Sequence, residues 1–222
     1  MIRIAVAVCL MLSLASPATA GPWLREKGKS FVSQSFTLNK SLESASSSYI
    51  EYGWSDRTTI GADVGMFRDL SKGQSGFATF FMRRNFGNPD RRAKLAWELG
   101  LGAGWVGDTL IPHLKTGVSW GRGYQLGERG GWMVVDASVR WDLGQSLHVV
   151  KVDGTVGLNL NERFTGMVQL YLSHADGDSH ATLAPSLIWT PKSGKYKIQI
   201  GAESPVDAFS DTAVKIGIWR EF

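Results

Sequence analysis

The chain has 222 residues, a formal net charge of +4, 26 glycines, seven prolines and a single cysteine, Cys9. So balanced a charge gives no reason to expect a nucleic-acid partner. Because Cys9 lies in an N-terminal stretch that we expect to be removed, disulfides and thiol catalysis are excluded from the mature chain.

Residues 1–20 have the features of a secretory signal peptide. Arg3 supplies a positive charge, residues 4–14 are apolar, and Ala18-Thr19-Ala20 is a small-residue cleavage site before Gly21. The apolar run is too short to span a bilayer as a helix. We therefore expect cleavage at about Ala20 and a mature chain, residues 21–222, that forms one domain. Residues 21–29 are expected to be a short lead-in, with no room for an N-terminal plug domain.

Twelve segments after this lead-in show a period of two residues and have about the length of a tilted membrane strand. A count of ten or fourteen strands is the alternative. The expected spans are 29–40, 47–55, 58–68, 75–86, 93–106, 110–122, 131–143, 147–160, 163–175, 180–190, 195–204 and 211–222.

The alternation is clearest in residues 93–106. Leu95, Leu99 and Leu101 share one face, and Glu98 and Gly100 lie on the other. A strand with one apolar and one polar face separates two environments. In hydrocarbon an unpaired backbone N–H or C=O group costs several kcal/mol, so β structure spans a membrane only as a closed sheet. The sequence therefore predicts an all-β fold, a transmembrane antiparallel up-and-down β-barrel.

Tryptophan offers a separate test of this assignment. Seven of the nine tryptophans fall near the ends of the expected strands, as interfacial girdles of a membrane barrel would. Those near one end are Trp54, Trp120, Trp132, Trp189 and Trp219, and those near the other are Trp105 and Trp141.

The closing segment, residues 212–222, also alternates and ends in Phe222. It resembles the C-terminal assembly signal of Gram-negative outer-membrane β-barrel proteins, and residues 49–62 resemble a strand–turn–strand hairpin of such barrels. The resemblance implies an outer-membrane location, short periplasmic turns, and longer extracellular loops at 41–46, 68–74, 173–179 and 205–211. It also implies contacts with outer-membrane lipid, periplasmic chaperones and the barrel-assembly machinery. It transfers no catalytic residue and no cofactor.

If the apolar face meets lipid, the polar face lines the lumen. Charges of both signs there indicate either a salt-bridge network that fills the barrel or a hydrated pore. Inward Gly100, Gly102, Gly104 and Gly117 would leave space, which favours a narrow pore for small polar solutes. The candidate lumen residues are Glu51, Asp63, Glu98, His113, Lys115, Asp136, Arg140, Lys151, Asp153, Lys197, Glu203 and Lys215.

Two other functions remain open. One is a non-conducting structural or adhesive barrel that acts through its extracellular loops. The other is a surface lipid hydrolase with a Ser–His pair, although no G-x-S-x-G motif occurs and no catalytic residue is assigned. The alternating His174, Asp176, Asp178 and His180 are weak candidates for a metal site, because imidazole and carboxylate suit divalent cations. A solvated hairpin tip would have the same composition.

Overall fold

The computed structural model describes residues 21–70, 73–87, 91–144, 148–192 and 194–222, so the expected signal peptide lies outside the described residues. No helix among them has the length and the apolar character that crossing a membrane would require. One turn of 3-10 helix, η1 (Phe209–Asp211), precedes the last strand. The strands are β1 (Ser30–Asn39), β2 (Ser44–Ser55), β3 (Thr58–Asp69), β4 (Gly73–Asn85), β5 (Ala93–Val106), β6 (Thr109–Leu126), β7 (Arg129–Asp142), β8 (His148–Asn159), β9 (Phe164–Ala175), β10 (Asp178–Trp189), β11 (Lys197–Pro205) and β12 (Ala213–Glu221).

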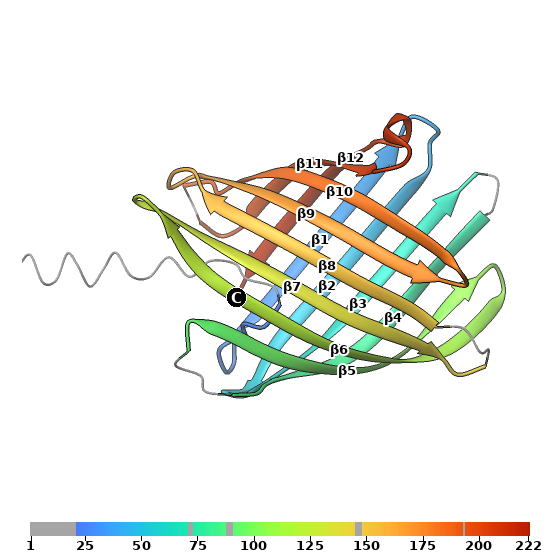
Figure 1. Ribbon diagram of the computed structural model, residues 1–222, viewed down its shortest axis with the longest axis horizontal. Coiled ribbons are helices and arrows are strands. Elements are labelled where there is room, and N and C mark those ends of the chain that lie inside the picture. The colour runs from blue at the N-terminus through green and yellow to red at the C-terminus, as the bar shows by residue number, and fades with distance from the viewer. Residues whose placement is uncertain (1–20, 71–72, 88–90, 145–147, 193) are drawn as a thin grey trace, which may run out of the picture.

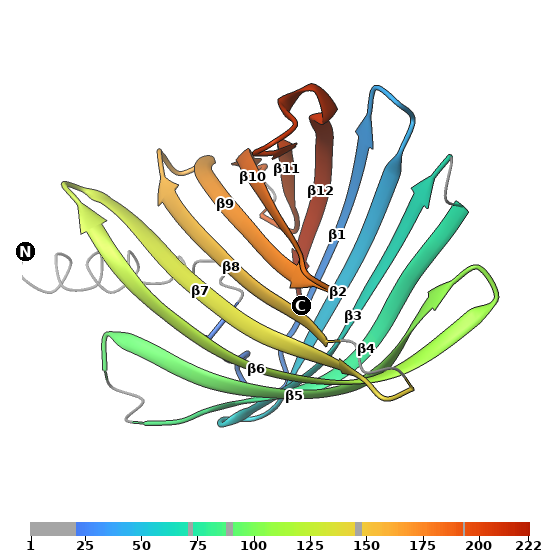
Figure 2. The ribbon, with the colours of Figure 1, turned by 45° about the vertical axis from the view of Figure 1, so that its right-hand side comes forward.

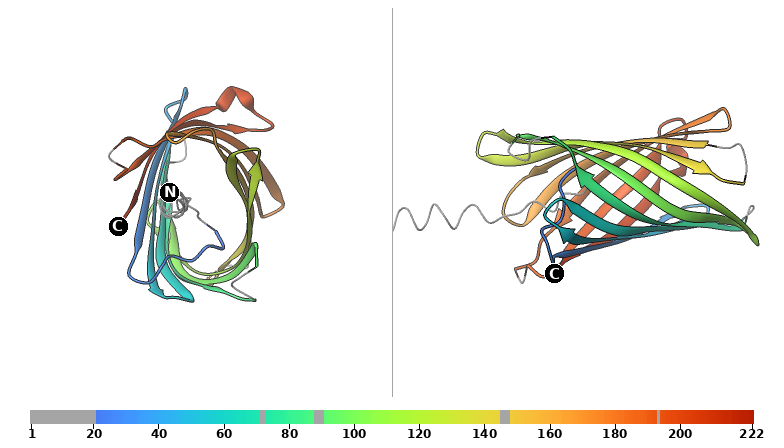
Figure 3. Two further views of the ribbon diagram at one scale, coloured as in Figure 1. Left: turned by 90° about the vertical axis from the view of Figure 1, so that its left-hand side faces the viewer. Right: turned by 90° about the horizontal axis from the view of Figure 1, so that it is seen from below.

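The twelve strands form one closed barrel in which each strand pairs with its neighbours in sequence and β1 pairs with β12 (Figure 1, Figure 2). The pairing is antiparallel throughout, and Ser33 of β1 lies opposite Trp219 of β12 where the barrel closes. Figure 3 shows the ring of strands around the lumen. The predicted all-β barrel and its count of twelve strands are confirmed.

The two faces of the sheet differ in chemistry. On β5, Leu99 and Leu101 are exposed on the outside, whereas Ala96 and Glu98 are buried on the inside. The same holds on β12, where Ile216 and Ile218 are exposed and the neighbouring lumen face carries polar residues. The outer surface is therefore a belt of large apolar side chains, as the alternation predicts.

Several connections are shorter than predicted, whereas the one between β11 and β12, residues 206–212, agrees with the loop expected at 205–211. β9 and β10 extend into the expected 173–179 loop and leave only Asp176 and Gly177 between them, both at positive φ (52° and 87°), as a two-residue hairpin turn requires. Likewise β6 and β7 run through residues 123–131 and leave only Gly127 and Glu128. The prediction of long loops at 41–46, 68–74 and 173–179 is wrong. Turn-forming residues do not by themselves end two strands whose backbones can continue to pair with each other.

We call the end of the barrel at which β1 begins and β12 ends the terminal end, and the opposite end the distal end. Backbone hydrogen bonds join Ser30 and Phe222 in both directions at the terminal end (3.2 and 3.0 Å). The start and the finish of the mature barrel thus meet on the same rim.

Candidate functional site

The inward faces of the strands enclose a cavity of about 360 Å³, which we call the lumen cavity. Four candidate lumen residues do not line it: Glu51 and His113 are buried, Glu203 pairs with Lys215 (2.7 Å) and Lys197 pairs with Glu221 (3.8 Å). The eight that do line it are Asp63, Glu98, Lys115, Asp136, Arg140, Lys151, Asp153 and Lys215.

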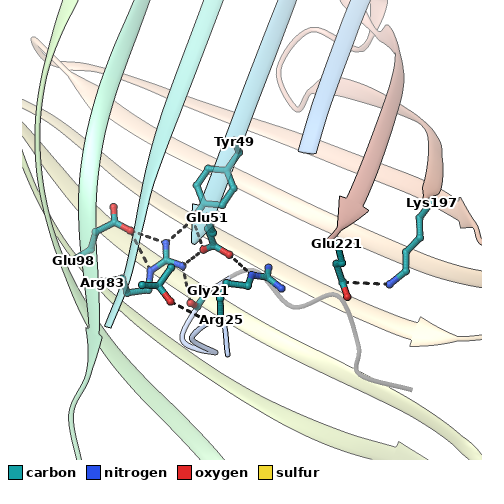
Figure 4. Close-up of polar contacts among 9 residues, drawn as sticks. Gly21, Arg25, Tyr49, Glu51, Arg83, Glu98, Lys197 and Glu221 are labelled. Atoms are coloured by element: carbon teal, nitrogen blue, oxygen red, sulfur yellow. Dashed lines mark hydrogen bonds and ion pairs between the residues drawn. The ribbon is translucent and has the colours of Figure 1, made fainter. Parts of the chain in front are cut away.

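The tightest polar contacts in the lumen converge on Arg83 of β4, which the sequence analysis did not single out (Figure 4). Its Nη1 donates to Glu51 (2.7 Å) and to the carbonyl of Gly21 (2.9 Å). Its Nη2 donates to Glu98 (2.6 Å) and to the Tyr49 hydroxyl (2.8 Å), and its Nε donates to Glu98 (3.2 Å). All five guanidinium N–H groups therefore have an acceptor.

Two further cations complete this ion-pair network, by which we mean Arg25, Glu51, Arg83, Glu98 and Lys115. Nε of Arg25 lies 2.5 Å from Glu51, whose side chain is fully buried, and Nζ of Lys115 lies 2.8 Å from Glu98. Buried carboxylates are stable only with such partners. The network therefore joins β2, β4, β5 and β6 to the chain before β1.

That chain, residues 21–29, lies inside the barrel and is called here the N-terminal segment. The backbone N–H of Arg25 donates to the hydroxyl of Thr59, and that of Gly28 donates to the carbonyl of Gly53 (both 2.9 Å). Gly53 in turn donates to the carbonyl of Lys29 (2.9 Å). The expectation of a simple lead-in is wrong, because the segment has hydrogen-bond partners on the inner wall.

Two strand glycines make room for this segment. A Cβ added at Gly53 would lie 2.0 Å from the backbone oxygen of Glu26, and one added at Gly121 would lie 2.5 Å from the ring of Trp23. Real Cβ atoms do not approach other atoms so closely, so both positions need glycine while the N-terminal segment is in place. Pro22 is among the fully buried residues.

Apolar side chains occupy the lumen beside the segment. Trp132, Val134, Met167 and Ile188 are buried against one another, and Trp23 and Trp219 pack onto them; we call these six residues the apolar layer. Trp132 and Trp219 were expected in an interfacial girdle, but they face inward, so that assignment is wrong for these two. Trp54 and Trp189 are exposed on the outside as predicted.

The N-terminal segment separates two spaces. The lumen cavity reaches Gly21, Trp132 and Trp219. A second pocket of about 290 Å³ is lined by residues 23–27 of the segment together with Asp56 and Lys94. The described lining residues of the two spaces do not overlap, so the segment and the apolar layer lie between them, and we call the segment and this layer together the partition.

Two charge pairs on β7 and β8, toward the distal end, are loose. Arg140 lies 3.4 Å from Asp142, and Lys151 lies 3.6 Å from Asp153, with half of the Lys151 side chain exposed. One carboxylate oxygen each of Asp136 and Asp153 is buried without a hydrogen-bond partner among the described residues. These two oxygens therefore lie within the wall of the cavity without a compensating donor in the described part of the chain.

Gly104 of β5 leaves space, since the nearest atom to an added Cβ is 3.5 Å away, but Gly102 does not leave the space that was expected of it. A Cβ at Gly102 would lie 2.1 Å from the carbonyl oxygen of Ala78 and 2.9 Å from Nε2 of His113. Here Thr79 and the buried His113 form a hydrogen bond of 2.8 Å across β5. The glycine therefore permits close packing of neighbouring strands, and His113 belongs to the wall.

The other histidines lie near the distal rim. The His148 ring contacts that of Trp141 (centroids 4.7 Å apart). Nδ1 of His174 lies 2.9 Å from the Ser179 hydroxyl on the exposed β9–β10 hairpin. Within the described residues, no group of three or more potential metal ligands comes together, at 174–180 or elsewhere.

No protein-family model matches the chain, and no curated protein sequence matches it. Solved structures do. The KdgM porin superposes with a TM-score of 0.62 at 8% identity, over 86% of this chain and 99% of that one. The NanC porin gives 0.59 at 12% identity over 85% and 98%. The COG4313 outer membrane channel from Pseudomonas putida F1 gives 0.56 at 12% identity over 94% and 100%. The chain therefore has the fold of outer-membrane porins.

Proposed function

We propose that the protein is an outer-membrane barrel that passes small polar solutes through a narrow lumen of mixed charge. The observation that carries this proposal is the lumen cavity of about 360 Å³ inside a closed barrel. Large apolar side chains such as Phe80 (72% exposed) and Leu101 (62%) cover the outside. This surface is stable against hydrocarbon, and a continuous apolar belt would promote aggregation in water.

Location and orientation follow from the same proposal. In this proposal the chain is exported and cleaved after Ala20. Periplasmic chaperones and the barrel-assembly machinery then insert it from the periplasm, so that its terminal end faces the periplasm. In outer-membrane barrels both ends of the barrel chain lie on the periplasmic side. The N-terminal segment then stands at the periplasmic mouth.

The charge balance of the cavity favours a neutral or zwitterionic solute. One neighbour has been solved as the KdgM porin in complex with disordered oligogalacturonate, a polyanion. In the present chain the described ionisable residues of the lumen cavity are Arg83, Lys115, Arg140, Lys151 and Lys215 against Asp63, Glu98, Asp136 and Asp153. Five cations face four carboxylates, so the wall gives a polyanion little net attraction.

Single-channel recording in a planar bilayer tests the pore. Because the N-terminal segment stands in the lumen at the terminal end, we expect brief openings with weak ion preference, rather than a steady current. The matched variants are Ser35→Trp, which projects into the lumen cavity, and Phe36→Trp, one residue along on the lipid face. The first should lower the unit conductance, and the second should leave it unchanged.

A folded barrel without measurable current does not by itself overturn the pore proposal, since the N-terminal segment in its docked position would also block conduction. The decisive experiment therefore compares the unsubstituted protein with Gly53→Ala, in which the added methyl group displaces the N-terminal segment. If both proteins fold and neither conducts, the pore proposal is overturned, and the lumen charges serve to fill the barrel.

Assembly through the C-terminus is a separate part of the proposal. Deleting Phe222 removes the residue whose backbone pairs with Ser30 and whose ring is stacked under Arg220 (4.3 Å). We expect a marked loss of heat-modifiable barrel in the outer membrane, with Phe222→Trp retaining assembly. Normal barrel levels after the deletion would show that the last residue is not read as a signal.

A further inference from the structure

Two carboxylates in the lumen lack adequate partners. Asp136 of β7 and Asp153 of β8 lie directly opposite each other in the strand register, and both line the lumen cavity. Like charges at directly opposed positions destabilise a sheet. Lys151 pairs loosely with Asp153, and Ser119 supplies a hydrogen bond to Asp136. Within the described part of the chain, however, no cationic side chain forms an ion pair with Asp136, and its Oδ1 is buried without a partner.

Gly21 lies against that unpartnered oxygen. A Cβ added to Gly21 would lie 3.6 Å from Oδ1 of Asp136 and 2.6 Å from a methyl group of Val134. Gly21 is buried, has a positive φ of 95°, and accepts a hydrogen bond from Arg83 (2.9 Å). Its α-carbon is therefore fixed between β7 and the ion-pair network, and its nitrogen is one bond away from that carbon.

We infer that the new N-terminus created by cleavage docks in the lumen, with the Gly21 α-ammonium group forming an ion pair with Asp136 beside Asp153. The inference rests on the proposed export and on cleavage after Ala20. Hydrolysis of the Ala20–Gly21 bond consumes one water and yields the Ala20 carboxylate and the free Gly21 amine. Before cleavage the same nitrogen belongs to a neutral amide, which carries no charge and donates a single N–H.

The docked ammonium group supplies what this part of the lumen lacks. It adds one positive charge and up to three N–H donors next to two carboxylates, and such charge-assisted hydrogen bonds are strong where water is scarce. Glycine at position 21 allows the chain to lie this close to Asp136, because any side chain there would collide with Val134. Processing then does more than release the chain, since it provides the charge that fastens the partition at the terminal end.

Protection of the amine tests the inference independently of conduction. The protein is exported and processed in a bacterial host and purified as the folded barrel. It is then treated with limiting N-hydroxysuccinimide acetate, and acetylation of Gly21 is followed by mass spectrometry. Asp136→Asn should accelerate this acetylation about tenfold or more, because a buried hydrogen bond between charged groups is replaced by a weaker one.

Two matched variants sharpen the result. Asp63→Asn neutralises another carboxylate of the lumen cavity, on β3, and should leave the rate as in the unsubstituted protein. Asp136→Glu keeps the charge and should retain slow acetylation. Heat-modifiable migration establishes that each variant is folded.

Equal acetylation of Gly21 in the unsubstituted and Asp136→Asn barrels would overturn the inference. So would an intact mass showing that the mature chain does not begin at Gly21. Neither outcome bears on single-channel conductance. A barrel with a protected amine that never conducts would instead support the docking and count against the pore.

Discussion

At the terminal end of the lumen, each N–H group of Arg83 has an acceptor within 3.2 Å, and Glu51 is fully buried. Toward the distal end, Lys151 stands 3.6 Å from Asp153 with half of its side chain exposed. Both regions are built from inward positions of the same alternating strands. The difference lies in what fills them, since the N-terminal segment occupies one end and leaves the other open.

This contrast separates two uses of charge in one barrel. Where the chain itself fills the lumen, ion pairs are buried, short and complete, and they hold elements together. Where the lumen is open, as around Lys151 and Asp153, the pair is long and partly exposed, so it contributes little to stability but can act on a solute in the cavity. Substitutions at the two ends should therefore affect different measurements.

The largest effect is expected for Arg83→Ala. It leaves Glu51 and Glu98 with one cation each and removes the bond to Gly21, and breaking a buried ion pair in this way costs about 3–5 kcal/mol. Urea unfolding of the barrel in lipid vesicles measures the loss. The control is Lys151→Ala, whose partner Asp153 lies 3.6 Å away and whose side chain is half exposed; a cost of about 1 kcal/mol or less is expected there. Equal costs at both sites would remove the distinction between the two ends.

The next effect concerns the partition. Gly53→Ala places a methyl group where the Glu26 backbone oxygen lies, so the N-terminal segment must leave its position. We expect the fraction of time that the channel spends open to rise severalfold in single-channel recordings, while the unit conductance through the lumen cavity is unchanged. Gly104→Ala is the matched control, because the nearest atom to its added methyl group is 3.5 Å away. An unchanged open fraction in Gly53→Ala would mean that the segment does not limit conduction.

The period of two residues, together with the expected signal peptide, the tryptophan positions and the terminal Phe222, predicted the barrel, a count of about twelve strands and the inward face. Inward positions such as Asp63, Lys115 and Asp136 follow from it directly, because a closed sheet has only an inside and an outside. Loop lengths were predicted less well. Polar and glycine residues are as suitable for the solvated end of a strand pair as for a loop, and residues 173–179 continue the hairpin.

The partition could not be read from the same pattern. The register of Phe80-Phe81-Met82-Arg83-Arg84 is ambiguous in the sequence, since apolar and basic residues are adjacent. Only pairing with β3, in which Thr59 lies opposite Arg83, turns Arg83 inward. Trp132 and Trp219 were assigned by depth along the strand and not by face. Had alternation been applied to them, both would have fallen on the lumen side together with Asp136 and Lys215.

The smallest effect is expected for Lys151, whose partner is distant, in comparison with Lys115, which bonds to a buried carboxylate. Lys151→Gln removes a charge whose partner is distant, so the free energy of unfolding should change by less than about 1 kcal/mol, while the reversal potential in a salt gradient moves toward cation preference. Lys115→Gln should produce a similar shift in preference. It should also cost about 1–3 kcal/mol, because Lys115 bonds to buried Glu98 at 2.8 Å. A reversal potential unaffected by Lys151→Gln would place that lysine outside the path of the ions, and the conducting route would then lie along the serine-rich wall formed by Ser33, Ser35 and Ser47.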